Sequence, residues 1–306
     1  MAGPSPALHL RQCTGCGATV ELTGVGLSAT CGYCGAPMVD ESRATAAIDA
    51  IVPFRVPKPG ALDRLRTYLA GHRWAPRELH DLRVDGRGLR GMLVPFWVYE
   101  GVVRSQYQAR VGVDWYRTVT THINGKTQTQ RKRETEWFTL TGSAARQIED
   151  HLVSASVGLS EPESNALEPF DLGWARDFDP RMLSGLEAEL PSVATVNADQ
   201  TATVELRDAE RQRLPAQLLP GDHNRVEQIA SQIEIRARRL VLLPVWIASY
   251  EHRDVQLRLL VNGQTGEVVG VVPKSKLKIA LAVLAGVVVV GLVVLAVILA
   301  TKGLPG

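Results

Sequence analysis

The sequence lacks the short motifs of the common catalytic sites. It contains no G-x-S-x-G or H-E-x-x-H segment, which argues against nucleophile-elbow hydrolases and helical zinc peptidases. Gly125-Lys126-Thr127 imitates the end of a phosphate-binding loop, but Thr120 stands where that loop needs a glycine. The histidines are scattered, and Glu149-Asp150-His151 is placed on a predicted helix whose adjacent side chains diverge. We therefore predict no catalytic residue, no bound small-molecule cofactor and no enzyme activity.

Charged and polar side chains are absent from one long stretch, Ile279 to Ala300. As an α-helix, these 22 residues would cover roughly 33 Å, enough to cross a hydrocarbon core of ~30 Å. A buried core helix of this length would normally carry polar residues on one side, so the pattern predicts a single transmembrane helix. Membrane lipid is accordingly an expected partner.

The flanks of this run predict its orientation. Only Lys302 follows it, whereas three lysines that we expect at the lipid headgroups precede it: Lys274, Lys276 and Lys278. Residues 1–12 show neither a basic n-region nor a long apolar stretch, so no secretory signal is predicted. We expect a single-pass protein of the cell membrane, with its body in the cytoplasm and its C-terminus outside.

Cysteine is confined to one short N-terminal window. The chain has four cysteines, Cys13, Cys16, Cys31 and Cys34, in a C-x2-C-x14-C-x2-C array. This spacing is typical of a zinc ribbon, in which two knuckles each aim two sulfurs at one ion. Four thiolates fill a tetrahedral shell, so the predicted Zn²⁺ is structural. Between the knuckles, Thr19–Leu22 and Leu27–Thr30 are predicted to form a short hairpin.

Three alternatives to structural zinc exist for this window: a disulfide, a redox site and a nucleic-acid reader. Stable disulfides are disfavoured in the cytosol, and a redox C-x-x-C would open a helix in a βαβ setting that is missing here. A nucleic-acid reader needs clustered Lys and Arg, whereas Arg11, Glu21 and Asp40 are the only charged residues between Leu10 and Asp40. The net charge of +2 leaves nucleic-acid binding open, but the ribbon's composition disfavours it.

The body carries two related signals. Leu93-Val-Pro-Phe-Trp97 and Leu242-Leu-Pro-Val-Trp246 share an apolar-Pro-apolar-Trp core, and strand-like sequence with Asn-Gly turns follows each. A helix ending near Gly71 precedes the first signal. The pattern predicts an α+β protein whose body consists of two related antiparallel-sheet α+β units. The expected divisions are a zinc ribbon over 8–40, a linker over 41–47, the two units over 48–190 and 191–273, and the transmembrane helix over 279–300.

These features together resemble a family of bacterial TFIIB-type zinc-ribbon membrane proteins, whose members often carry the label primosomal protein N' (replication factor Y) or superfamily II helicase. Besides the ribbon and the apolar run, the resemblance rests on Ile51-Val-Pro-Phe54, Trp74-Ala-Pro76, Leu152-Val-Ser-Ala-Ser156, Leu167-Glu-Pro-Phe-Asp-Leu172, Leu260-Val-Asn-Gly-Gln-Thr-Gly266 and the two body signals. The family usually has a long charged helix between 191 and 228, whereas Pro191, Pro215 and Pro220 interrupt this sequence.

The resemblance implies a partner class but no chemistry. Some relatives are associated with membrane proteins of the phage-shock type or with SPFH-domain proteins. A helicase motor needs a phosphate loop and an acidic Mg²⁺ motif, and this sequence has neither. We therefore expect a tail-anchored, cytosol-facing adaptor or scaffold that holds protein partners at the membrane, in an envelope-stress setting. The alternative is a membrane-tethered nucleic-acid-binding protein without helicase activity.

Overall fold

The computed structural model describes residues 9–14, 16–22, 28–31, 34, 36–39, 48–72, 74–75, 88–123, 126–183, 186–252 and 255–302. The predicted linker, 41–47, lies outside these residues. The N-terminal strands are β1 (His9–Gln12), β2 (Thr19–Leu22), β3 (Ser28–Thr30) and β4 (Pro37–Val39). The body contains β5 (Ala50–Ile51), α2 (Lys58–Gly71), β6 (Leu89–Ile123), β7 (Lys126–Ser154), α4 (Glu161–Leu167), β8 (Arg176–Asp177), β9 (Glu187–Ala188), α5 (Thr195–Gln217), β10 (His223–His252), β11 (Val255–Asn262) and β12 (Val268–Gly270), with 3₁₀ turns at Leu172–Trp174 and Pro180–Leu183. The last helix is α6 (Lys276–Lys302).

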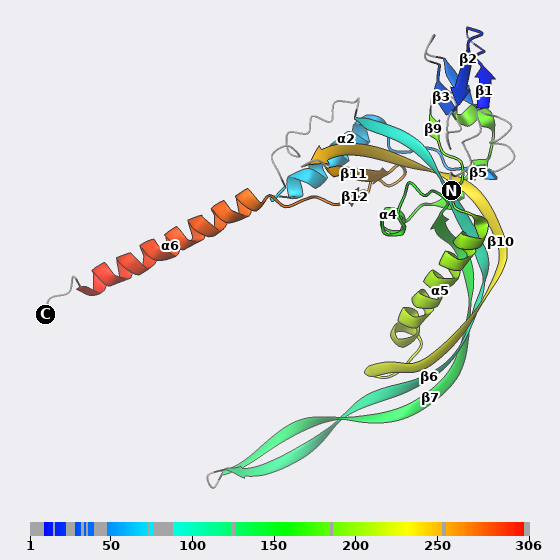
Figure 1. Ribbon diagram of the computed structural model, residues 1–306. Helices are drawn as coiled ribbons and strands as arrows, with labels where there is room; N and C mark the ends of the chain where they lie inside the picture. Colours follow the sequence, from blue (N-terminus) through cyan, green and yellow to red (C-terminus); the bar gives the residue numbers. More distant parts are fainter. Residues whose placement is uncertain are drawn as a thin grey trace, which may run out of the picture.

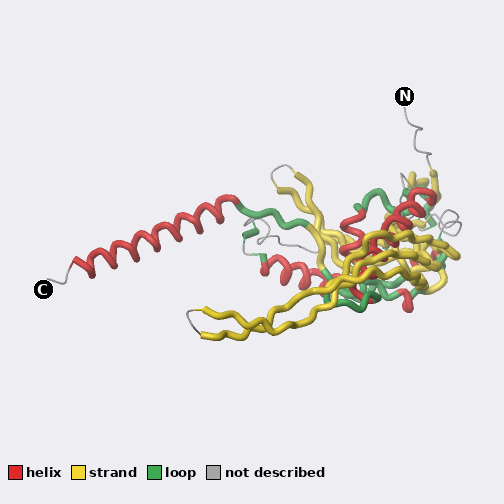
Figure 2. The backbone as a smooth tube through the Cα atoms, turned by 90° about the horizontal axis from the view of Figure 1, so that it is seen from below, coloured by secondary structure: helices red, strands yellow, loops and turns green. Residues whose placement is uncertain are grey.

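The body is an α+β structure built on one curved, mainly antiparallel sheet. Its long strands β6, β7 and β10 form an arc, and α4 and α5 lie inside the arc (Figure 1). Figure 2 shows the β6/β7 hairpin and α6 extending away from the rest of the body. The main apolar cluster lies where β6, β10 and β11 meet the segment around α4, and it includes the fully buried Phe96 and Leu167.

The two predicted α+β units share one sheet in the structure. Strand β10 of the second unit pairs antiparallel with β6 of the first along most of its length. The two related signals pair with each other: Pro95 lies opposite Leu242, Val94 opposite Leu243, and Pro244 opposite Leu93. Val94 and Leu243 occupy equivalent positions in the two motifs, so a local two-fold axis passes through this pair. Separate sheets would have left the edges of two largely apolar strands exposed, and their mutual pairing removes those edges.

The structure agrees with the predicted β6/β7 turn and with the end of helix α2, but it contradicts the helix predicted at Glu149-Asp150-His151. Strands β6 and β7 pair up to Ile123 opposite Lys126, as a two-residue turn requires, although Asn124 and Gly125 themselves lie outside the described residues. Helix α2 ends at Gly71 as predicted. Glu149-Asp150-His151 was wrongly placed on a helix, since it belongs to β7 at a register shift opposite Tyr99 and Gly101. The sequence pattern there misled because a bulge disturbs strand alternation.

The prolines between 191 and 228 do not break the helix expected of the resembling family. Pro191 precedes α5, Pro220 follows it, and Pro215 lies in its last turn. Pro215 cannot donate a hydrogen bond to the carbonyl of Arg211, yet the helix continues past it to Gln217. Inside α5, Ala198, Ala202 and three further residues are buried, which shows the face that packs on the sheet: Leu206, Glu210 and Leu214 complete it.

In the described part of the chain, no helix is both long enough and apolar enough to qualify as a membrane span. The transmembrane helix predicted over 279–300 is unsupported by this search and stays a prediction.

Helix α4 is fastened to the sheet by an ion pair that should shape the response to acid. Glu163 contacts the Arg258 guanidinium at 2.8 and 2.5 Å, and the hydrogen bond from this arginine is the main cause that lowers the pKa of Glu163 to about 2. An unfolded glutamate has a pKa near 4.3, so the stabilisation is present above about pH 5 and is lost as pH falls toward 2.

We expect Glu163→Gln to remove this acid-dependent loss. The difference between the free energies of unfolding at pH 6 and pH 3 should shrink by about 1–2 kcal/mol, discounted for partial solvent exposure of the pair. Denaturant unfolding at several pH values measures it. The control is Asp63→Asn, because Asp63 belongs to an exposed ion pair with Arg66. An unchanged acid response in Glu163→Gln would contradict the assignment.

Candidate metal centre

Two similar turns bring the four cysteines together. In each C-x-x-C knuckle, the N–H of the first cysteine donates to a carbonyl five residues ahead: Cys13 to Ala18 and Cys31 to Ala36, both at 2.8 Å. Gly17 also donates to the Cys13 carbonyl and has a φ of +75°, a conformation that glycine adopts without strain. Gly17 therefore permits a tight first turn that leaves both sulfurs on one side.

Each knuckle is enclosed by its own hairpin. Strand β1 pairs with β2 across the first knuckle, and β3 pairs with β4 across the second. The prediction of one hairpin between the knuckles, joining 19–22 to 27–30, is therefore wrong. The physical reason is that the Cys13–Ala18 and Cys31–Ala36 hydrogen bonds are each the last rung of a strand pair, so each pair closes around its own turn.

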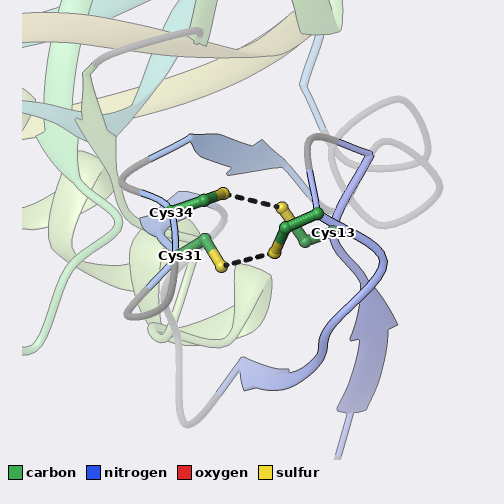
Figure 3. Close-up of side chains that lie close together, drawn as sticks. Cys13, Cys31 and Cys34 are labelled. Carbon is green, nitrogen blue, oxygen red and sulfur yellow. Dashed lines mark hydrogen bonds between the residues drawn. The ribbon is translucent and has the colours of Figure 1, made fainter.

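The four sulfurs have the spacing of a tetrahedral centre. All four Sγ atoms lie within 4.8 Å of one another, with Cys13 and Cys34 at 3.6 Å and Cys16 and Cys31 at 3.7 Å (Figure 3). A tetrahedron with metal–sulfur bonds of about 2.3 Å has edges of ~3.8 Å. Cys13 and Cys31 are 2 % exposed, whereas Cys16 and Cys34 face solvent. The predicted ligands thus form one group that fits a structural metal ion such as zinc.

The crowding of the thiols affects their protonation. A hydrogen bond from the backbone of Ala36 lowers the pKa of Cys34, but hydrogen bonds shared with the thiols of Cys16 and Cys13 outweigh it and raise the pKa to about 12. Four thiolates this close repel one another unless a cation lies between them. A divalent metal that replaces the thiol protons removes this repulsion, so binding should weaken at low pH.

The centre is joined to the body by a contact that sequence reasoning missed. Ser28 Oγ donates to the Leu186 carbonyl at 2.5 Å and accepts from the Ala188 N–H at 3.1 Å. Val39 of β4 packs against the body cluster that contains Ala188 and Leu93. Strand β9 in turn pairs with β6, so the knuckles are docked beside the central sheet. A single serine in a short strand gives no sequence signal for this role.

Apart from the metal centre, a cavity of about 260 Å³ lies between the sheet and the loop after β7. Met92 and Ile247 form part of its apolar floor. Its charged groups already have partners inside the protein: Arg258 contacts Glu163, and Ser156 Oγ donates to both carboxylate oxygens of Glu189 at 2.8 Å. Because these polar groups bind one another and hold the loop in place, they do not indicate which ligand could bind in the cavity.

Comparisons with known proteins give one distant relative. No family model matches the chain, and no solved structure matches it. The uncharacterized protein YdjG of Bacillus subtilis (strain 168) is 24 % identical over 249 residues, which cover 75 % of this chain and 65 % of that protein. The chain therefore spans less than two thirds of this relative, whose description names no activity.

Proposed function

We propose that this protein is a membrane-attached adaptor: α6 lies in the bilayer, a structural Zn²⁺ orders the N-terminal knuckles, and the body holds protein partners at the membrane surface. The observation that carries the proposal is the surface of α6. From Ala280 to Val297, the described side chains of α6 are apolar and exposed, among them Leu281 at 56 %, Val287 at 64 % and Val290 at 63 %. A continuous exposed apolar surface is costly in water, whereas hydrocarbon solvates it.

The connection between body and helix supports attachment close to the bilayer. Ser275 donates to the Trp74 carbonyl at 2.7 Å, and Lys278 Nζ donates to the Ala75 carbonyl at 2.7 Å. The start of α6 is thus held against the segment after α2. Lys274 is exposed beside it and would meet anionic headgroups if α6 is inserted. With the lysine-rich end of α6 on the body side, the proposal places the body in the cytoplasm.

Protein partners are favoured over nucleic acid by the ribbon's composition. Arg11 is the only basic residue between Leu10 and Asp40, so the knuckles offer no cluster for phosphates. The four-sulfur centre leaves no open coordination position once an ion is bound, which supports a stabilising role for Zn²⁺. From the family resemblance, the proposed partners are membrane-associated proteins of the phage-shock or SPFH type in an envelope-stress setting.

The test of attachment is membrane retention after charge is placed in α6. Val287→Lys combined with Val290→Lys should release the full chain from membranes washed with alkaline carbonate, because each lysine at a bilayer centre costs about 2.5–3.5 kcal/mol. The matched control is Val157→Lys with Val196→Lys, since both valines are exposed on the body. Immunoblotting of the soluble and membrane fractions measures the outcome. Equal retention of both variants would contradict insertion of α6.

The adaptor role needs a second measurement. Crosslinking in membranes followed by mass spectrometry should recover membrane-stress proteins with the wild-type chain and lose them in the charged α6 variant. Salt-sensitive retention of DNA or RNA by the purified protein would instead favour the nucleic-acid alternative.

A further inference from the structure

The far end of the β6/β7 hairpin extends past the rest of the sheet. Strand β10 pairs with β6 only as far as His223 opposite Gly112. Beyond this point, 113–123 pairs with 126–136 as a two-stranded ribbon (Figures 1 and 2). A two-stranded ribbon is marginally stable in water unless one of its faces is covered. This stretch would therefore gain stability from a partner that covers one of its faces.

One face of the ribbon continues the apolar face that α5 covers. On that face, Ala109 and Val111 are buried, and Leu219, just after α5, packs on them. The next apolar residues along the same face are exposed: Val113 is 43 % exposed, Trp115 45 % and Phe138 50 %. The apolar row thus runs on past the end of its helical cover.

The opposite face of the ribbon carries two cation–aromatic pairs, and its Tyr116 and Trp137 are 55 % and 42 % exposed. Arg110 lies over the Trp137 ring at 5.6 Å, and Arg131 lies over the Tyr116 ring at 5.0 Å. These stacked cations cover part of the aromatic surface and keep it polar outward. The face with Trp115 differs because it continues the apolar face that α5 and Leu219 cover, and it is the docking face considered below.

Charge along the docking face changes sign over a short distance. Residues that pair directly across antiparallel strands share a face. Glu136 lies opposite Val113 and Glu134 opposite Trp115, and the next pair on this face is Arg117 with Lys132. An acidic segment is therefore followed by a basic segment, with the Trp115 side chain beside the boundary. Glu134 Oε1 already contacts Arg117 Nε at 2.7 Å and Lys132 Nζ at 3.7 Å within the chain, so Glu136 is the outer acidic group of this strip.

We propose that this face is an interface with a second copy of the same chain. Two copies packed face to face about a two-fold axis at the Trp115–Glu134 pair, with their ribbons antiparallel, place Glu136 of each copy against Arg117 and Lys132 of the other. The same rotation brings the two Trp115 side chains together at the centre. A two-fold axis is the commonest symmetry of protein dimers, and it suits a strip whose two halves carry opposite charge. An anionic bilayer would be repelled by the acidic half.

The interface is small. The strip around Trp115 is narrow, and the strong twist of two-stranded ribbons limits how far two faces can follow each other. Stable interfaces usually bury about 1,200–2,000 Å² in total, so the pair is expected to be weak in solution and to gain from any confinement of both copies.

Charge reversal tests the proposal. Glu134→Lys with Glu136→Lys makes the strip uniformly basic, and Arg117→Glu with Lys132→Glu makes it uniformly acidic. Each variant alone should sediment as a monomer in detergent at concentrations where the wild-type chain associates. An equimolar mixture should restore association, because each strip then meets its opposite charge. Restoration also shows that both altered hairpins are folded.

Single aromatic substitutions provide a second test. Trp115→Ala should lower the association constant at least tenfold, as expected for a central aromatic anchor. Tyr116→Ala, the matched change on the opposite face, should leave it within about twofold of the wild type. Association that Trp115→Ala does not weaken, or a charge-reversed mixture that stays monomeric, would overturn the proposal. Association that only substitutions in α6 remove would overturn it as well.

Discussion

Cys31→Ser should abolish stoichiometric zinc binding and unfold the N-terminal knuckles while leaving the body folded. Cys31 is a buried member of the four-sulfur group, and its loss leaves three ligands and an incomplete tetrahedral shell. Zinc binding in comparable small modules supplies folding free energy on the order of 10–16 kcal/mol, and a module this small buries little core of its own. Metal analysis of the purified protein measures the first effect.

Hydrogen exchange on the same variant distinguishes unfolding of the ribbon from unfolding of the body. Amides of β1 to β4 should lose protection in Cys31→Ser, whereas those of β6 and β10 should keep it, because their apolar clusters are built largely from body residues. Ser28→Ala is the control, since it removes the docking contacts and leaves all four sulfurs in place. Retention of one zinc per chain by Cys31→Ser would show that the four-cysteine assignment is wrong.

Asn262→Ala should destabilise the body more than any other single amide removal among the described residues. The Asn262 side chain is fully buried, and its Nδ2 donates to the carbonyls of Leu167 at 2.8 Å and Pro169 at 3.0 Å. Its Oδ1 accepts from the N–H groups of Gln264 at 2.8 Å and Thr265 at 3.0 Å. The alanine variant leaves four backbone groups without this partner, and we expect a loss of about 3–5 kcal/mol.

Thermal and urea unfolding measure this loss. The control is Asn165→Ala, because Asn165 makes an exposed contact with Glu205 and should change the unfolding free energy by less than about 0.5 kcal/mol. Asn262→Asp adds a second comparison, since it keeps both acceptor contacts and loses the two donated ones. If Asn262→Ala were as stable as Asn165→Ala, the bonds that join the β11–β12 turn to the segment after α4 would not matter for folding.

Asn262 has one role that neighbouring residues predict and one that they do not. The Asn262-Gly263 pair predicted the turn, and the structure places it between the paired strands β11 and β12. The same pattern gave no sign that the asparagine binds a segment 93 to 95 residues away. Turn formation depends on neighbouring backbone angles, whereas that contact depends on how α4 and β11 pack.

The metal site was almost wholly predictable from the cysteine spacing. A C-x-x-C turn is a local structure, and one ion requires two such turns within a few ångströms, so the ligand set could be assigned without the fold. The layout of the strands around it could not be assigned. Which strands close around each knuckle depends on the hydrogen bonds of Cys13 and Cys31, and the docking through Ser28 depends on β9, far along the chain.

Local patterns in the sequence determined the α+β class, the hairpins at residues 123–126 and 262–268, helix α2 and the four clustered cysteines, because each depends on residues close together in the chain. The tertiary structure decided that the two related segments form one sheet, since Pro95 and Leu242 pair across 147 residues. It also decided which face of the β6/β7 hairpin is left uncovered, because that depends on where α5 ends and where β10 stops pairing. Pairing and burial between distant segments are energies of the folded chain as a whole, and no single stretch of sequence contains them.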